Sequence, residues 1–358
     1  MRICYFGAFD PQYARNNLLR AALADAGSEV VICNVPRNWP TWRKAPALIR
    51  RYLPLVRQCD LILVAEFGQA LVPLGWLLGR LTGKPLVFDF LISLYQANVE
   101  ERRLYAPNSR QARRYRQLDR VAASLPDCVL VQTRSFRDYA VRTFDIDPIA
   151  LRFVPLGVNT DLFHPLELPP PTSERLIVLY FGSYIPNHGV DVILNAAAYL
   201  ADDPHFLFRF IGEGEGKPAA QSLADSLDLP NVEFQPRLPF ADLPQAIAQA
   251  DIVLGVFGDT PQAQVLLANK VIQGLAMRKL VVAGDTLSNR EFFTDGEHLI
   301  LTPLADPTAL AEALRRAAAL PSERRAQVAS AGYERFTEHF THHAIGQQLS
   351  GIFSEMLD

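Results

Sequence analysis

Residues 176–200 read LIVLYFGSYIPNHGVDVILNAAAYL, and this stretch decides the fold. It opens with an apolar run over Leu176–Gly182, which predicts a strand buried on both faces. A turn with glycine and proline follows, and apolar residues at helical spacing then predict a helix through Val192–Leu200. A strand that passes through a glycine turn into a helix is the repeating unit of an open, parallel α/β sheet.

The same unit recurs along the whole chain. In the first half, apolar runs predict strands at Arg2–Ala8, Glu29–Val35, Leu61–Ala65, Pro85–Phe90 and Cys128–Gln132. In the second half they predict further strands at Phe206–Ile211, Val232–Gln235, Ile252–Val256, Leu280–Gly284 and Leu299–Thr302. The chain therefore predicts an α/β fold of two doubly wound parallel sheets, each able to bind a ligand at the carboxyl ends of its strands.

We expect two domains, at residues 1–160 and 173–335. The proline-rich stretch Pro165–Thr172 cannot pair in a sheet and is interpreted as the linker. A helix over residues 336–358 is expected to pack back toward the first domain.

Composition narrows the class of protein. The chain has 358 residues, of which 49% are hydrophobic and 20% charged, and this excludes a disordered chain or a coiled coil. Its N-terminal residues resemble a first strand rather than an export signal. The four cysteines show no metal-ligand spacing and are interpreted as reduced thiols, so we expect a cytoplasmic protein.

Charge is divided unevenly. Residues 1–155 carry 22 Lys and Arg against 13 Asp and Glu, whereas residues 156–358 carry 13 against 25. Basic residues with bordering tryptophans lie between Arg37 and Arg57, and seven arginines lie between Arg102 and Arg120. Such segments are typical of a peripheral surface for an anionic membrane. The alternative is a set of solvated helices packed on the sheet. No nucleic-acid recognition module is visible, so we expect no nucleic-acid partner.

Six segments of the second half share an order and a spacing. They are VPLGVNTDLFHP (154–165), YFGSYIPNHGVDVIL (180–194), FIGEGE (210–215), VEFQPRL (232–238), KVIQGLAMRKLVVA (270–283) and NREFFTDGEHLIL (289–301). Together they resemble the motifs of family-4-like glycosyltransferases, the glycosyl transferases group 1. The resemblance implies the GT-B fold, in which two Rossmann-like domains face a cleft.

The resemblance also implies a function. In that family the second half binds a nucleotide-diphospho-sugar, usually without a metal, and the sugar passes to an acceptor held by the other half. We therefore expect a hexosyltransferase of glycan biosynthesis that needs no cofactor and acts on a glycan or lipid-linked acceptor. The donor-binding positions it implies are Gly7, Gly182, Ser183, Gly212, Gly214, Arg237, Leu238, Asn269 and Gln273.

This chain departs from the family pattern at the charged positions. The family's phosphate-binding arginine and lysine fall on Ser183 and His188. Its two glutamates fall on Val265 and Gln273, and glutamine can still bond ribose hydroxyls. We interpret these changes as a variant donor site.

Lys270 is the first catalytic candidate. It lies in the first turn of a predicted helix, where a cation is electrostatically unfavourable unless an anion binds there. We expect Lys270 to stabilise the leaving diphosphate, aided by His188 when that ring is protonated.

Asp89 is the candidate base. If the reaction inverts configuration, a carboxylate must take the acceptor proton, and Asp89 ends the strand Pro85–Phe90. Glu66, which follows the strand Leu61–Ala65, is the alternative. If configuration is retained, neither is required as a base.

Other functions fit less well. A nucleotide-sugar epimerase of the same fold would need carboxylates at Val265 and Gln273, and a solute-binding receptor would need export. A catalytically inactive, nucleotide-binding partner protein is separated from an enzyme only by turnover. Asp145-Ile146-Asp147 is formally a metal motif, but Pro148 follows it and a turn is the interpretation.

Overall fold

The structure is a computed structural model that describes residues 1–168 and 175–357. The chain divides into two compact units. Unit 1 comprises Met1–Asn159 with Phe340–Asp358, and unit 2 comprises Thr160–His339. The predicted linker Pro165–Thr172 lies outside the described residues from position 169 onward, as does the predicted start of the second domain at 173.

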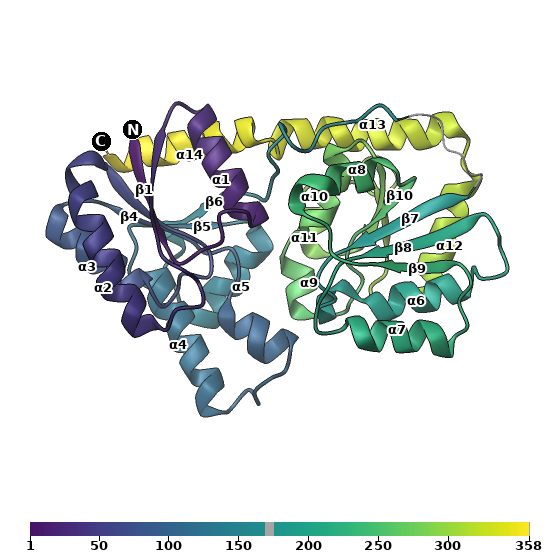
Figure 1. Cartoon of the computed structure of the whole chain (residues 1–358), viewed down its shortest axis with the longest axis horizontal. Helices are drawn as coiled ribbons and strands as arrows, with labels where there is room; N and C mark the ends of the chain where they lie inside the picture. The colour runs from purple at the N-terminus through teal and green to yellow at the C-terminus, as the bar shows by residue number, and fades with distance from the viewer. Residues whose placement is uncertain (169–174, 358) are drawn as a thin grey trace. The chain divides into compact units, whose positions relative to one another are not determined.

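Unit 1 contains one sheet of six parallel strands in the order β2-β1-β3-β4-β5-β6 (Figure 1). Its inner strands β3, β4 and β5 are buried along their whole length, as their apolar sequences predict, with Asp89 at the end of β4 the one charged residue among them. The strands are β1 (Arg2–Gly7), β2 (Glu29–Asn34), β3 (Leu61–Val64), β4 (Leu86–Asp89), β5 (Cys128–Val131) and β6 (Leu151–Phe153).

Helices cover both faces of this sheet. The helices α1 (Ala14–Asp25) and α14 (His342–Leu357) pack together on one face, where Leu349 and Phe353 join the core beneath β1. Because parallel crossovers are right-handed, the helices that follow β2 to β5 lie on the other face. They are α2 (Thr41–Tyr52), α3 (Val72–Thr82), α4 (Arg110–Ser124) and α5 (Arg134–Phe144). Short turns η1 (Leu53–Gln58) and η3 (Pro148–Ala150) and a π-helix η2 (Gln96–Glu101) complete the unit.

Unit 2 repeats the plan with the order β12-β11-β10-β7-β8-β9. Its strands are β7 (Leu176–Phe181), β8 (Phe206–Ile211), β9 (Val232–Gln235), β10 (Ile252–Leu254), β11 (Leu280–Gly284) and β12 (Ile300–Thr302). The pairs are all parallel, so the carboxyl ends of the strands meet at one edge of the sheet. Because β7 has β8 on one side and β10 on the other, the strand order changes direction beside β7, which is where ligands bind in open α/β sheets.

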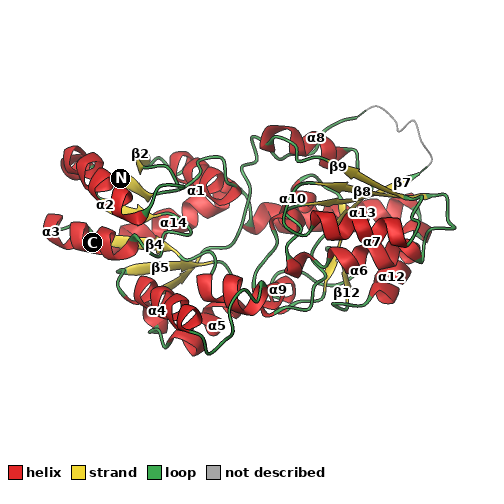
Figure 2. Ribbon diagram, turned by 60° about the horizontal axis from the view of Figure 1, so that its bottom comes forward, coloured by secondary structure: helices red, strands yellow, loops and turns green. Residues whose placement is uncertain are grey.

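Helices also flank the strands of unit 2 in both views (Figures 1 and 2). The helices α6 (Val190–Ala198), α7 (Lys217–Ser226) and α12 (Pro307–Ala319) pack on one another and on the main core. The helices α10 (Asn269–Ala276) and α13 (Ser322–His339) pack together beside β11. The shorter ones are η4 (Pro186–His188), η5 (Phe240–Asp242), α8 (Leu243–Ala248), α9 (Pro261–Val265) and α11 (Leu287–Arg290).

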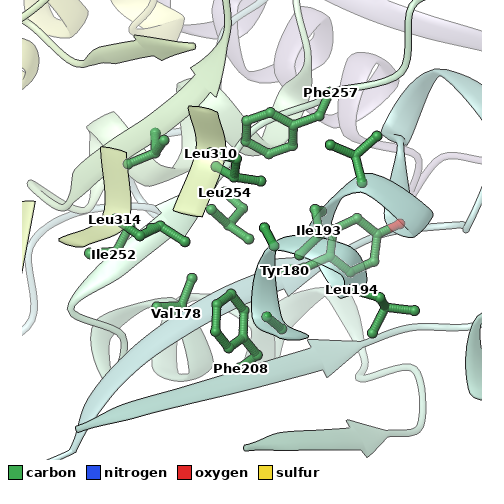
Figure 3. Packing of buried hydrophobic residues seen from close by; sticks show 14 of the residues in the cluster. Val178, Tyr180, Ile193, Leu194, Phe208, Ile252, Leu254, Phe257, Leu310 and Leu314 are labelled. Carbon is green, nitrogen blue, oxygen red and sulfur yellow. The ribbon is translucent and has the colours of Figure 1, made fainter. Parts of the chain in front are cut away.

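The core of unit 2 fixes the strand ends that carry the candidate site. Val178, Phe208 and Ile252 meet the α12 side chains Leu310 and Leu314, and all are 2% exposed or less (Figure 3). The α/β fold of two Rossmann-like parallel sheets predicted from the sequence is confirmed. The helix expected over 336–358 consists instead of the end of α13 and the whole of α14.

Truncation of a core leucine should destabilise unit 2. We expect Leu314→Ala to lower the free energy of unfolding by about 2–5 kcal/mol, because it removes buried methyl groups and leaves a cavity. Urea denaturation measures the loss. The matched control is Leu287→Ala, whose side chain is 58% exposed and whose replacement should change stability by less than about 0.5 kcal/mol. Equal effects of the two substitutions would contradict this packing.

Candidate functional site

Lys270 places a buried amine at the carboxyl edge of the unit 2 sheet. It is the second residue of α10, is 5% exposed, and its Nζ has no hydrogen-bond partner among the described residues. The Nζ lies 4.4 Å from the centroid of the Tyr180 ring. Burial holds the pKa of this amine well below its usual range, since nothing nearby compensates the charge. An anion within reach of Nζ would remove that penalty.

His188 lies beside Lys270 and is held by Tyr180. The Tyr180 hydroxyl is 2.7 Å from His188 Nδ1 and accepts a hydrogen bond from the Tyr184 amide at 3.2 Å. When Tyr180 donates to Nδ1, the neutral ring carries its proton on Nε2. His188 then presents an N–H donor even without a charge.

Gly182 completes this cluster because it has no side chain. A Cβ at this position would lie 2.9 Å from His188 Cε1 and 3.2 Å from Lys270 Nζ. Its φ of +155° is also one that side-chain-bearing residues rarely adopt. The structure therefore brings together three of the predicted residues, Gly182, His188 and Lys270.

The glycine run at 212–216 packs directly on the neighbouring loop. A Cβ on Gly212 would lie 2.0 Å from the Gly182 oxygen, and one on Gly214 would lie 1.7 Å from the Ser183 oxygen. These glycines therefore let two backbone segments touch, which explains the pattern without a ligand. Their contact with the donor, and that of Ser183, stays a prediction.

The other predicted donor positions lie further along the same edge or elsewhere. Asn269 precedes Lys270, and Gln273 faces the interior one turn later, 3% exposed. Arg237 and Leu238 follow β9, the edge strand of the sheet. Gly7 ends β1 in unit 1. Their binding roles stay predictions.

Two polar residues of this region escaped the sequence analysis. Tyr180 orients His188, but the sequence pattern of an aromatic residue within an apolar strand predicts only a core position. Asn187 is 8% exposed, and its Oδ1 has no hydrogen-bond partner within the described part of the chain. The only sequence feature that pointed to a place for Asn187 near the site is its position directly before His188.

Asp89 ends β4 in a closed ion pair. The Arg15 guanidinium donates to both carboxylate oxygens, with Nε–Oδ2 and Nη2–Oδ1 distances of 3.0 and 2.9 Å, and a third bond reaches the Pro155 oxygen at 2.7 Å. Both side chains are 1% exposed or less. Protonation of Asp89 would leave a buried guanidinium without its counter-ion. The role of Asp89 as a base stays a prediction, and this pairing opposes it.

Glu66 follows β3 at the same edge of unit 1. Its Oε1 accepts a hydrogen bond from Asn16 Nδ2 at 2.8 Å, whereas its buried Oε2 has no partner among residues 1–168 and 175–357. Burial, together with the charge of Asp89, raises the pKa of Glu66 to about 8. Glu66 is therefore able to exchange a proton near neutral pH.

The described residues contain neither a cluster of metal ligands nor a membrane-spanning helix. No group of three or more His, Cys, Asp or Glu is placed to hold a metal ion in the described residues. Over that same part of the chain, every helix is too short or too polar to cross a bilayer.

Two family models match the chain. The model described as glycosyl transferase 4-like domain matches residues 8–157, and the one described as glycosyl transferases group 1 matches residues 175–319. The chain thus carries a glycosyl transferase 4-like domain followed by a glycosyl transferases group 1 domain. The resemblance stated from the six sequence motifs is thus confirmed.

A curated relative is similar over part of the chain. It is the D-inositol 3-phosphate glycosyltransferase of Streptomyces griseus, 31% identical over 173 residues, which make up 42% of this chain and 36% of that protein. The chain covers between 23% and 56% of the length of the curated relatives it matches.

Solved structures share the fold along almost the whole chain. Sucrose-phosphate synthase from Thermosynechococcus elongatus superposes with a TM-score of 0.78 at 18% identity, covering 99% of both chains. Anabaena Alr3699/HepE, in complex with UDP and glucose, superposes with a TM-score of 0.76 at 15% identity, covering 99% of this chain and 100% of that one. At these identities the likeness establishes the GT-B fold alone.

Removal of the buried Lys270 amine should raise the stability of the ligand-free protein. The folded protein binds the proton of Lys270 more weakly than the unfolded chain does. At any pH below the ordinary lysine pKa of 10.5, this difference lowers the free energy of unfolding. The loss becomes smaller as the pH rises toward 10.5. We therefore expect Lys270→Met to raise the melting temperature at pH 7, and to raise it less at pH 9.5. Thermal unfolding at the two pH values measures this. A lower melting temperature for Lys270→Met at pH 7 would show that the amine has a stabilising partner.

Proposed function

We propose that this protein transfers a sugar from a nucleotide-diphospho-sugar to a glycan or lipid-linked acceptor, as a hexosyltransferase that needs no metal or other cofactor. The observation that carries the proposal is the buried Lys270 amine beside His188 and Gly182. A diphosphate would supply the counter-charge that Lys270 lacks, and the absence of a side chain at Gly182 lets His188 and Lys270 lie against the backbone there. Family membership and the GT-B fold support the same reaction class.

The reaction breaks the bond between the anomeric carbon and the diphosphate. The bonding electrons leave with the diphosphate, and a new bond forms from the acceptor oxygen to that carbon. The acceptor hydroxyl gives its proton to Asp89 or Glu66 if configuration is inverted, and to the departing diphosphate if it is retained. Lys270 in its charged form and the Nε2 proton of His188 would stabilise the negative charge as it develops. Lys270, protonated once the diphosphate binds, is proposed to do this work in place of a divalent cation.

Uridine diphosphate is the first nucleotide to test. The Anabaena protein of the same fold was crystallised with UDP and glucose. Residues after β9, including Arg237 and Leu238, are proposed to hold the base, and Gln273 to bond the ribose hydroxyls in place of the family's glutamate.

An anionic membrane surface is proposed to bind unit 1 and so to recruit the protein peripherally to the cytoplasmic face of a membrane. Residues 30–59 hold six basic and no acidic residues. Trp42 and Leu53 are 70% and 62% exposed on α2 and η1, and Leu81 of α3 is 74% exposed. Tyr52 Oη lies 2.9 Å from Thr82 Oγ1, so the ends of α2 and α3 adjoin and place Leu53 and Leu81 on neighbouring turns. Exposed apolar side chains with surrounding cations match an anionic lipid surface.

Turnover decides between the enzyme and the inactive partner protein. We expect the purified protein to release nucleoside diphosphate slowly from one of UDP-, GDP-, dTDP- or ADP-sugars. Lys270→Ala should lower that rate by about 10²–10³-fold, because a preorganised donor for the leaving group is lost. The matched control is Lys279→Ala, a half-buried lysine at the amino end of β11 that bonds the Ala248 oxygen. Nucleotide binding without any hydrolysis or transfer would contradict the proposed activity and favour the inactive partner.

Vesicle binding tests the membrane surface. We expect the protein to sediment with phosphatidylglycerol vesicles more than with phosphatidylcholine vesicles, and less at high salt, since screening weakens surface charges. Trp42→Ala and Arg50→Glu should each reduce sedimentation. Ile149→Ala removes an equally exposed apolar side chain elsewhere in unit 1 and should leave binding unchanged. Equal binding to the two lipids would rule the surface out.

A further inference from the structure

A cavity of about 410 Å³ opens at the amino edge of the unit 1 sheet. It lies where α3 ends, where β4 begins at Leu86 and where Asp127 leads into β5, and Met356 near the end of α14 also lines it. Asp89 lies three residues further along β4, or about 10 Å at the rise of an extended strand. The cavity is therefore at the opposite edge from the candidate carboxylates, and no residue assigned to the transfer reaction lines it.

Two glycines shape the turn that forms one wall of the cavity. Gly83 ends α3 with a φ of +67°, a left-handed conformation that glycine adopts without strain. The amides of Gly83 and Lys84 both donate to the Gly79 oxygen, the second at 2.9 Å. A Cβ on Gly79 would lie 2.6 Å from the Lys84 oxygen, so the helix packs directly on the turn. Backbone contacts alone thus hold Lys84 at the cavity.

The charged side chains that line the cavity do not balance. They are Arg80, Lys84 and Asp127. Asp127 Oδ2 accepts a hydrogen bond from the Leu86 amide at 2.8 Å, and its Oδ1 lies 3.7 Å from Arg80 Nη2 in a loose, exposed ion pair. The Lys84 amine forms no hydrogen bond or ion pair with the residues that the structure describes. One positive charge of the lining is therefore uncompensated.

Apolar surface makes up most of the remaining lining. Trp76 and Met356 are half-buried, and Leu86 is 1% exposed. Indole and thioether groups both pack well against flat rings. The Arg80 guanidinium lies 5.9 Å from the centroid of the Trp76 ring, which brings a cation to the edge of this surface. The cavity therefore combines a surface for an aromatic ring with a net positive charge, at a volume that is typical of small-molecule sites.

We propose that this cavity binds a small aromatic carboxylate. The ring packs on Trp76 and Met356, and the carboxylate accepts hydrogen bonds from Lys84 and Arg80. A single negative charge balances the lining, whereas the second charge of a phosphate would be repelled by Asp127. The cavity takes no part in the proposed sugar transfer, so this inference is independent of that proposal.

Three ligands with one ring system test the proposal. The full chain is titrated with 2-naphthoate, 2-naphthamide and 2-naphthyl phosphate, and saturation-transfer NMR reports their binding. We expect 2-naphthoate to bind about tenfold more tightly than 2-naphthamide, which lacks the charge, and more tightly than 2-naphthyl phosphate, which carries a second one. Excess UDP should leave the 2-naphthoate signals unchanged, because the cavity lies outside the proposed donor site.

Two substitutions change the charge of the lining in opposite directions. Lys84→Gln removes the uncompensated cation and should weaken 2-naphthoate binding about tenfold. Asp127→Asn removes the one negative charge and keeps an oxygen for the Leu86 amide, so 2-naphthyl phosphate should then bind more tightly than 2-naphthoate. The matched control is Lys44→Gln, which replaces a half-buried lysine of α2 in the same unit and should leave binding unchanged.

The proposal is overturned if 2-naphthoate does not bind the wild-type protein, if either of the other two ligands binds as tightly, or if excess UDP displaces it. Equal affinity of the wild-type protein and Lys84→Gln for 2-naphthoate would show that the ligand binds elsewhere. A preference of Asp127→Asn for 2-naphthoate over 2-naphthyl phosphate would contradict the charge balance assigned to the cavity.

Discussion

The buried amine of Lys270 is the constraint on which the candidate site of the second unit depends. Burial of a charge without a counter-ion costs several kcal/mol, and the face of the Tyr180 ring offsets only part of this. A large apolar core beneath β7, β8 and β10 stabilises the unit and opposes that penalty. The proposed diphosphate would compensate this charge, and His188 lies close enough to share the contact.

Two carboxylates at the carboxyl edge of the unit 1 sheet lie in opposite environments. Asp89 is neutralised by Arg15 and contributes to the fold, whereas Glu66 has one oxygen without a partner and a pKa raised to about 8. Asp89 ends β4 and Glu66 follows the neighbouring strand β3, so position on the sheet alone does not explain why their environments differ. The difference comes from Arg15, which lies 74 residues away from Asp89 in the sequence.

Much of the fold could be read from local patterns. The bounds of β8, β9 and β11 agree with the predicted ones, because apolar runs of strand length end there at turns. The place of Lys270 in the first turn of α10 was also predictable from the helical pattern, whereas its binding role stays a prediction. The Arg15–Asp89 pair, the hydrogen bond from Tyr180 to His188 and the π-helix were not, because each depends on contacts between distant segments or on backbone geometry without a residue signature.

Proton uptake on nucleotide binding tests the central claim most directly. Calorimetric titration with UDP at neutral pH, in two buffers of different ionisation enthalpy, reports how many protons accompany binding. A diphosphate beside Lys270 restores the charge that burial suppresses, so the wild-type protein should take up about one proton more than Lys270→Met. Identical proton counts and identical affinities for the two proteins would show that the diphosphate binds elsewhere.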